Sequence, residues 1–454
     1  MSNDSSTLVA ERRRIGTGTI LLSAVLLLLV LFTLAFCGVQ YLTGRKVAAE
    51  LSKIRDASEP TNAAELEAFY ALPADVNDTT SLWMAAAQTL ATQKCQDDAG
   101  GLPWLEAGPL TPVGTPWPHQ EAAEQFLQKY HESREKIRQA VTLGGAARYP
   151  TRFRDAMGMR LSAQRDLRFV GSLLSLEYEV ELHRGEGLAA CEAVHSMFSL
   201  ARSLEYEPLM LSQLMRLAHD NMAFGHFERL MMSVEVPTDG LLQIDEDLAR
   251  VHYDQVLRRA LLGERAMGLE TFRQPQSLGS EAPSAAMTAI FGQGDQAVYL
   301  QLMGNLVKAS AAGPVSLDRE ARMLSATFQQ TPALWRFPVA KLMYPSMEAF
   351  AGAVAGAMAR RDVTHTAIAV ERYRRSQGRW PASLDDLVPG FISQVPADPF
   401  AAGPLRFVVG TDGCRVYSIG PDNVDQGGLV EEVNPPNDIV FRLPNREGPV
   451  TQDE

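Results

Sequence analysis

The stretch Val416–Gly428, which reads VYSIGPDNVDQGG, contains the residue types and spacing most suggestive of chemistry in this chain. A strand-forming run leads into Gly-Pro-Asp-Asn, and Asp425 follows Asp422 after three residues. Carboxylate and carbonyl oxygens are the ligands that Ca²⁺ prefers. Asp and Asn are also ordinary turn residues, because their side chains bond to the nearby backbone. The stretch therefore predicts either a cation-binding loop or a plain turn.

A second candidate site lies in the middle of the chain. His219 and Asp220 are adjacent, and His183, His226 and Asp254 could be recruited as distant ligands. The pair is similar to the His-Asp pair of metal-dependent phosphohydrolases, which need further ligands from several helices. The alternative is a surface or partly buried helical pair that binds no metal.

Glu264 and Arg265 lie within the apolar run LLGERAMG. A catalytic carboxylate is one interpretation, but buried charges in helical cores are usually paired, so we expect an ion pair that joins two helices. The chain contains no Gly-rich phosphate loop, GxSxG elbow or HExxH motif. We therefore expect a protein that is not an enzyme. The alternative is a membrane-bound metal-dependent hydrolase that uses the His and Asp residues above.

Length and charge limit the classes of protein further. A chain of 454 residues exceeds one hydrophobic core, so two or three folded units are expected. The net charge is -12, and no stripe of Lys and Arg with interleaved aromatic residues is present. Nucleic-acid binding is therefore not expected. The four cysteines are scattered without CxxC spacing, so they indicate neither a disulfide framework nor a zinc site.

The amino end predicts a membrane anchor. No charge occurs from Ile15 to Leu42, which exceeds the roughly 20 apolar residues that a spanning helix needs. The run is too long for a typical signal peptide, and bulky Phe36 before Cys37 argues against a lipoprotein site. Cationic residues flank the span on both sides, at 12–14 before it and at Arg45, Lys46, Lys53 and Arg55 after it.

The cluster before the span is closer to the apolar run, so residues 1–14 are expected in the cytoplasm. The protein would then be a single-pass protein of the cell inner membrane, with most of the chain on the periplasmic side. A cytoplasm-facing adaptor remains the alternative, because the flanking charges are nearly balanced.

The region after the span is expected to be helical. Residues 43–120 read as a connecting region of helices interrupted by Pro and Gly, in which Trp104 and Trp117 should pack onto the helices. Residues 121–345 show apolar stripes at three- and four-residue spacing, with a break at Arg184–Gly187. Their rhythm is similar to tetratricopeptide-type helical hairpins, although the full consensus is absent. The predicted fold class is mainly α, with an α-solenoid-like scaffold.

The carboxyl end changes character. Residues 346–443 predict a helix followed by strands in 404–410, 414–420 and 438–443, which together make a small α+β unit. Residues 444–454 are expected to be a flexible tail.

Several ordered elements of this unit resemble the carboxyl-terminal domain of type II secretion major pseudopilins. The elements are the helix, the Gly-Arg-Trp-Pro turn, the Asp-Pro-Phe element, the Ser-Ile-Gly-Pro-Asp strand exit and the Asn-Asp pair before the last strand. The resemblance covers about 361–441. In that family the last loop holds a calcium ion through Asp side chains and backbone carbonyls. The resemblance implies calcium ligation by Asp422, Asn437 and Asp438, and Asp425 is a further candidate by position.

The chain also departs from the family. ERRRIGTGTI does not match the prepilin cleavage pattern, and some 300 residues separate the membrane span from the pilin-like helix. A pilus subunit is therefore not expected. The sequence predicts a membrane-anchored scaffold or accessory protein that binds protein partners, with a link to secretion or pilus-like assembly implied by the resemblance alone.

Overall fold

The computed structural model describes residues 17–105, 111–329, 337–429 and 438–446. The structure is 68% helical, so the mainly-α prediction is confirmed. The α-helices of this part of the chain are α1 (Thr17–Asp56), α2 (Ala63–Phe69), α3 (Thr80–Leu90), α4 (Gln93–Asp98), α5 (Gln120–Lys129), α6 (His131–Leu143), α7 (Ser162–Arg184), α8 (Gly187–Ser203), α9 (Met210–Ser233), α10 (Thr238–Ala249), α11 (Tyr253–Arg273), α12 (Ala285–Ser310), α13 (Pro314–Gln329) and α14 (Pro338–Gln377).

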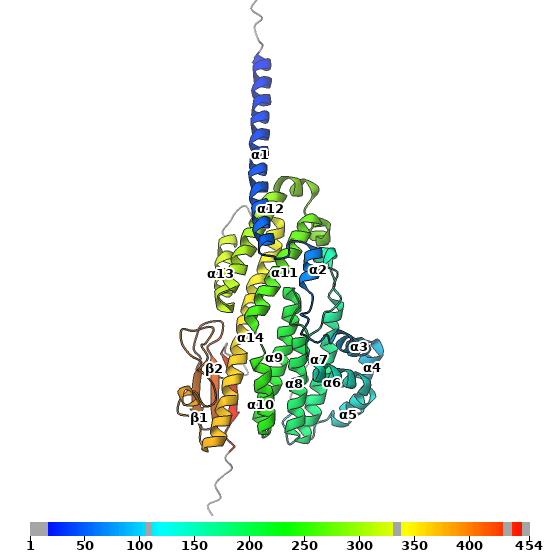
Figure 1. Ribbon diagram of the computed structural model, residues 1–454, viewed down its shortest axis with the longest axis vertical. Helices are drawn as coiled ribbons and strands as arrows, with labels where there is room; N and C mark the ends of the chain where they lie inside the picture. Colours follow the sequence, from blue (N-terminus) through cyan, green and yellow to red (C-terminus); the bar gives the residue numbers. More distant parts are fainter. Residues whose placement is uncertain (1–16, 106–110, 330–336, 430–437, 447–454) are drawn as a thin grey trace, which may run out of the picture.

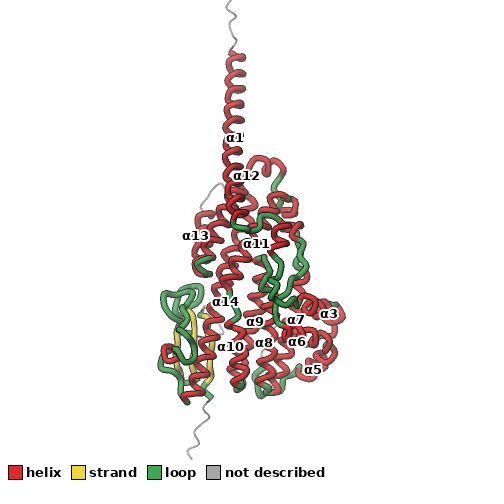
Figure 2. Tube along the Cα trace, in the orientation of Figure 1, coloured by secondary structure: helices red, strands yellow, loops and turns green. Residues whose placement is uncertain are grey.

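Short 3-10 helices and one small sheet complete the described structure. They are η1 (Phe153–Gly158), η2 (Pro275–Glu281), η4 (Leu384–Leu387), β1 (Arg406–Gly410), β2 (Gly413–Ser418) and β3 (Ile439–Pro444). Figure 2 shows the helices gathered into one elongated body, with the strands at one side of the end far from α1.

Helix α1 projects from the body (Figure 1). It is long and apolar enough to span a membrane, and its apolar window is fully exposed. The helix continues past Leu42 to Asp56, and its last turns enter the body, where Val47 and Ile54 are buried. The apolar anchor and the first helix of the body are therefore one continuous element.

Helices α7, α8 and α9 form the middle of the body as successive antiparallel neighbours. The predicted break at Arg184–Gly187 is confirmed, because α7 ends there and α8 begins at Gly187. Gly185 adopts a left-handed conformation, with φ of 79°, that glycine takes without steric cost. Trp104 and Trp117 are both buried, as predicted.

Helix α14 connects the two halves of the body. Its first half, including Phe350 and Val354, belongs to the apolar core next to α1, together with α11, α12 and α13. Its second half, including Val363 and Val370, belongs to a larger core that extends from α3 through α10 to the sheet. One helix therefore contributes to both cores.

The amino end of α14 is held by α12. The Asp295 carboxylate accepts hydrogen bonds from the backbone N–H groups of Val339, at 2.9 Å, and Ala340, at 3.1 Å. These are first-turn N–H groups that have no partner within their own helix. Burial raises the pKa of Asp295 to about 6.

The sheet is antiparallel in the order β1-β2-β3, and the three predicted strands are confirmed. Its register pairs Cys414 with Leu443 and Val416 with Phe441. These four side chains are buried and point to one face, as alternation along strands requires. That face packs on α14, and Phe441 also meets Phe227 of α9 at a ring-centroid distance of 5.9 Å.

Candidate functional site

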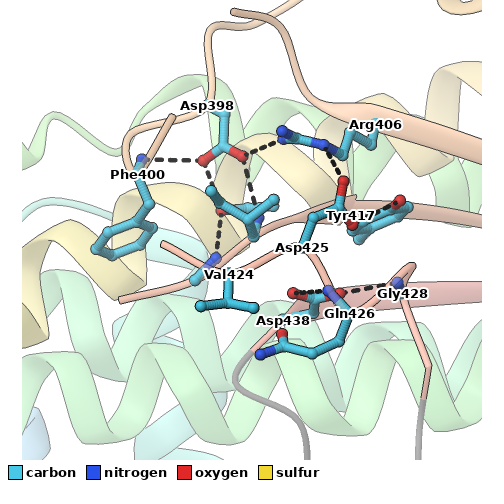
Figure 3. Close-up of polar contacts among 12 residues, drawn as sticks. Asp398, Phe400, Arg406, Tyr417, Val424, Asp425, Gln426, Gly428 and Asp438 are labelled. Atoms are coloured by element: carbon cyan, nitrogen blue, oxygen red, sulfur yellow. Dashed lines mark hydrogen bonds and ion pairs between the residues drawn. The ribbon is translucent and has the colours of Figure 1, made fainter. Parts of the chain in front are cut away.

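The acidic loop 420–429 follows strand β2 and lies beside the start of strand β1 (Figure 3). Asp425 turns toward that strand. Its carboxylate forms an ion pair with Arg406 Nε at 2.8 Å, and it accepts hydrogen bonds from Tyr417 Oη at 3.2 Å and from the Gly427 N–H at 2.9 Å. The Gly427 N–H and the Arg406 guanidinium lower the pKa of Asp425. Asp425 is thus an ionised partner of Arg406.

Asp398, in the Asp-Pro-Phe element, holds the exit of strand β2, from which the loop begins. Its carboxylate is buried and accepts four hydrogen bonds, which Figure 3 shows converging on it. The donors are Phe400 N at 2.9 Å, Ser418 Oγ at 2.7 Å, Ile419 N at 3.0 Å and Arg406 Nη1 at 3.1 Å.

Arg406 is the link between the buried anchor and the loop. Its guanidinium contacts Asp398 through Nη1 and Asp425 through Nε. Because a guanidinium is planar and presents several donors, it can fix two carboxylates at once. The exit of strand β2 and the loop that follows it are therefore held by one connected set of charges.

Asp422 and Asp438 lie on the two sides of Gln426. The Gln426 side-chain amide donates to Asp422 Oδ2 at 2.8 Å, while its backbone N–H donates to Asp438 Oδ1 at 3.4 Å. Asp438 Oδ2 also accepts the Gly428 N–H at 2.8 Å. Partial burial raises the pKa of Asp438, and the charges of Asp425 and Asp422 raise it further. Three carboxylates are thus close enough to repel one another.

These residues fit a calcium ion only in part. Asp422 and Asp438 both direct carboxylate oxygens toward Gln426. Asp425 instead forms an ion pair with Arg406, which is always charged. Among the described residues, no group of three His, Cys, Asp or Glu side chains converges on one point that could hold a metal. The fourth predicted ligand, Asn437, lies outside the described residues.

The histidine candidates of the helical region have separate partners. His219 is buried against Gly171, and burial lowers its pKa to about 4, so the ring is neutral at pH 7. His183 stacks on Trp117 at 5.4 Å, and His226 Nδ1 lies 2.7 Å from the carbonyl oxygen of Met222. The side chain of Asp254 lies outside the described part.

Asp220 faces protein groups rather than a ligand site. Its carboxylate accepts a hydrogen bond from Tyr253 Oη at 3.1 Å and lies 3.9 Å from Arg216 Nε. Burial raises its pKa to about 6. His219 and Asp220 are both buried in α9.

Glu264 and Arg265 have different roles. Arg265 forms an ion pair with Glu59, at 2.6 Å, which joins α11 to the segment between α1 and α2 rather than to a second helix. Among the residues that the structure describes, Glu264 has no ion-pair partner, which corrects the expectation for this residue. Its Oε1 instead accepts the backbone N–H of Met210 at 2.9 Å, at the start of α9. Burial raises its pKa to about 7. A carboxylate that bonds a helix amino end needs no cationic partner.

Sequence reasoning found the acidic loop but missed the residues that position it. Asp398 lies in the Asp-Pro-Phe element, to which the sequence assigns no role, and Arg406 lies in a predicted strand. Nothing in the sequence indicated that Arg406 would contact both carboxylates.

Comparison of the chain with protein-family models, with curated proteins and with solved structures returned no match. The class of protein therefore rests on the fold and the residues described above.

Replacing Asp398 by Asn should lower the free energy of unfolding by about 2–4 kcal/mol, since Arg406 loses a buried partner and an amide cannot accept all four hydrogen bonds. Urea unfolding of the detergent-solubilised protein measures this. Asp412→Asn, at an exposed turn position, is the matched control and should change stability by less than about 0.5 kcal/mol. Equal effects of the two substitutions would contradict the anchoring role of Asp398.

Replacing Glu264 by Gln should make the protein less sensitive to pH. The folded-state pKa of about 7 exceeds the ordinary 4.5, so the folded protein binds the proton more tightly and loses stability as pH rises from about 4.5 to 7. The neutral amide still accepts the Met210 N–H, so Glu264→Gln should be more stable than wild type at pH 8 by about 1–3 kcal/mol and similar to it near pH 4.

Thermal unfolding between pH 4 and pH 8 tests this prediction. Glu246→Gln on α10, whose side chain is 72% exposed, is the control and should follow the wild-type curve. A stability difference between Glu264→Gln and wild type that does not vary with pH would argue against a buried, proton-binding Glu264.

Proposed function

We propose that this protein is a membrane-anchored, non-enzymatic accessory protein that presents a pseudopilin-like unit, residues 361–441, to protein partners outside the cytoplasm. The observation that carries the proposal is the Asp398–Arg406–Asp425 connection. It holds the last loop at the strand exit where the sequence resembles the pseudopilin domain. A link to secretion or to a pilus-like assembly rests on that resemblance alone.

The architecture supports a presenting role. Figure 1 shows the sheet beside the half of the body far from α1, at a distance from the membrane that α1 would cross. The body between α1 and the sheet consists of helices packed around two large apolar cores and a smaller one. A stiff body of this kind fixes the distance between the anchor and the presented unit. The inner membrane and the periplasmic side are part of the proposal.

The surroundings of α14 support a role other than pilus subunit. Helices α9, α10, α11, α12 and α13 of the same chain pack on α14, in addition to β2 and β3. A helix whose faces are occupied in this way has no free side for packing against other subunits along a filament. We therefore propose a companion of an assembly rather than one of its repeating subunits.

The presented unit carries exposed apolar side chains that a protein partner would bury. Val408 and Val409 on the edge strand β1 are 36% and 48% exposed, and Val424 and Leu429 in the acidic loop are 54% and 49% exposed. An edge strand also presents unpaired backbone groups, which a partner strand can satisfy. We propose this surface, the β1 edge with the acidic loop, as the partner-binding surface.

Calcium is a further part of the proposal. Asp422 and Asp438 would hold the ion, and its charge would relieve the repulsion among the three carboxylates. Asp425 would remain with Arg406. No observation on the described residues favours the metal-dependent hydrolase over this proposal.

A photoreactive amino acid at Val409 or Val424 should give a discrete crosslinked protein band after irradiation of intact membranes. The same amino acid at Leu143, the last residue of α6, is the control, because Leu143 and Val409 are both 48% exposed. The two sites in the partner-binding surface should crosslink at least several-fold more efficiently. Equal crosslinking at Leu143, or none at either site, would contradict the proposed function.

Calcium binding should depend on Asp422 and Asp438. The double variant Asp422→Asn, Asp438→Asn should bind calcium at least about tenfold more weakly than wild type in calorimetric titration of the purified protein. Asp385→Asn, at an exposed position in η4, is the control and should retain wild-type affinity. Absence of calcium binding by the wild type would show that the acidic loop is the plain turn.

A further inference from the structure

Helix α12 begins beside the membrane-spanning helix rather than inside the body. The Gln40 side-chain amide donates a hydrogen bond to the Ile290 carbonyl oxygen at 2.6 Å. A Cβ placed on Gly44 would lie 3.2 Å from Oε1 of Gln293, so the helices also touch there. The contacted residue moves from Ile290 to Gln293 in α12 as the contact moves from Gln40 to Gly44 in α1, so the two helices run in the same direction. Figure 1 shows the chain between α11 and α12 rising beside α1 above the rest of the body.

The end of the apolar span in α1 indicates at which depth in the membrane these contacts lie. The uncharged run Ile15–Leu42 ends next to Tyr41, which is 66% exposed, and Arg45 is exposed one turn later. A Tyr followed by cations is the pattern of a membrane–water boundary. Ile290 therefore lies at the depth of that boundary. Ala286, one turn earlier in α12, lies about 6 Å further toward the hydrocarbon.

The residues at this depth suit lipid better than water. Residues 282–294, the α12 tip, contain no charged side chain, although charged residues make up 21% of the chain. Ala286, Ala289 and Ile290 are exposed and share one helical face, as their three- and four-residue spacing requires. Ile290 is 44% exposed. A pocket of about 220 Å³ lies beside the tip and is lined in part by Met287 and Phe291.

We propose that the α12 tip enters the head-group and upper acyl region of the bilayer that α1 spans, as a second membrane contact. The contact is end-on, since α12 runs along α1, and the rise from Ile290 to Ala286 carries the tip about 6 Å past the boundary. Glu281, exposed just before the tip, keeps its charge among the head groups or in water, so the tip does not insert into the middle of the bilayer. A single helix would let the body swivel, whereas two contacts fix which side of the body faces the membrane.

An environment-sensitive fluorophore on Ile290→Cys in the full chain, reconstituted into phosphatidylcholine vesicles, tests the proposal. Cys37→Ala removes the exposed native thiol, and Cys95, Cys191 and Cys414 are buried. The matched control is Leu188→Cys at the start of α8, far from α1, where Leu188 is 43% exposed. Emission at position 290 should be blue-shifted, and lipids with a nitroxide near the head group should quench it at least twofold more than at position 188.

Emission and quenching at position 290 equal to those at position 188 would overturn the proposal. A blue shift without quenching by nitroxide lipids would also overturn it, because the probe would then contact protein. A probe on Ala286→Cys adds a depth test and should be quenched more strongly than position 290 by a nitroxide placed deeper in the acyl chain. The reverse order would contradict the assigned orientation. None of these outcomes depends on partner binding.

Discussion

Burial of one face of the small sheet against α14 is the contact on which the arrangement of both ends of the molecule depends. Three short strands cannot sustain themselves in water without an apolar face covered by another element. Val416 and Phe441 supply that face, and the second half of α14 covers it. The first half of the same helix is buried in the core next to α1. The position of the sheet relative to the apolar helix α1 therefore follows from one continuous helix.

Two polar contacts complement this apolar one. At the start of α14, Asp295 accepts the N–H groups of Val339 and Ala340, which ties the helix to α12 and so to the region near α1. At the far end, Asp398 and Arg406 tie the exit of strand β2 to the acidic loop. Both use a buried carboxylate whose bonds replace those it gives up to water. The apolar cores set the positions of the elements, and these carboxylates set the conformation of the segments between them.

Local patterns were sufficient to predict much of the fold. The uncharged run after Ile15 predicted α1, the break at Arg184–Gly187 predicted the α7–α8 turn, and the strand-forming runs at 404–410 and 414–420 predicted β1 and β2. Each of these is a property of neighbouring residues. The candidate site was predicted less completely, because Asp398 and Asp425 are 27 positions apart and are connected through Arg406, a residue of the neighbouring strand.

The sequence by itself determined the apolar anchor, the mainly helical content and the order of the last strands, because hydrophobic periodicity and turn chemistry act over a few residues. Only the tertiary structure decided which charges meet. It paired Arg265 with Glu59 and left Glu264 to bond the start of α9, and it directed Asp425 to Arg406 while Asp422 and Asp438 bracket Gln426. The physical reason is that a buried charge takes whichever partner the packing brings within reach, and that distance is set by the whole fold.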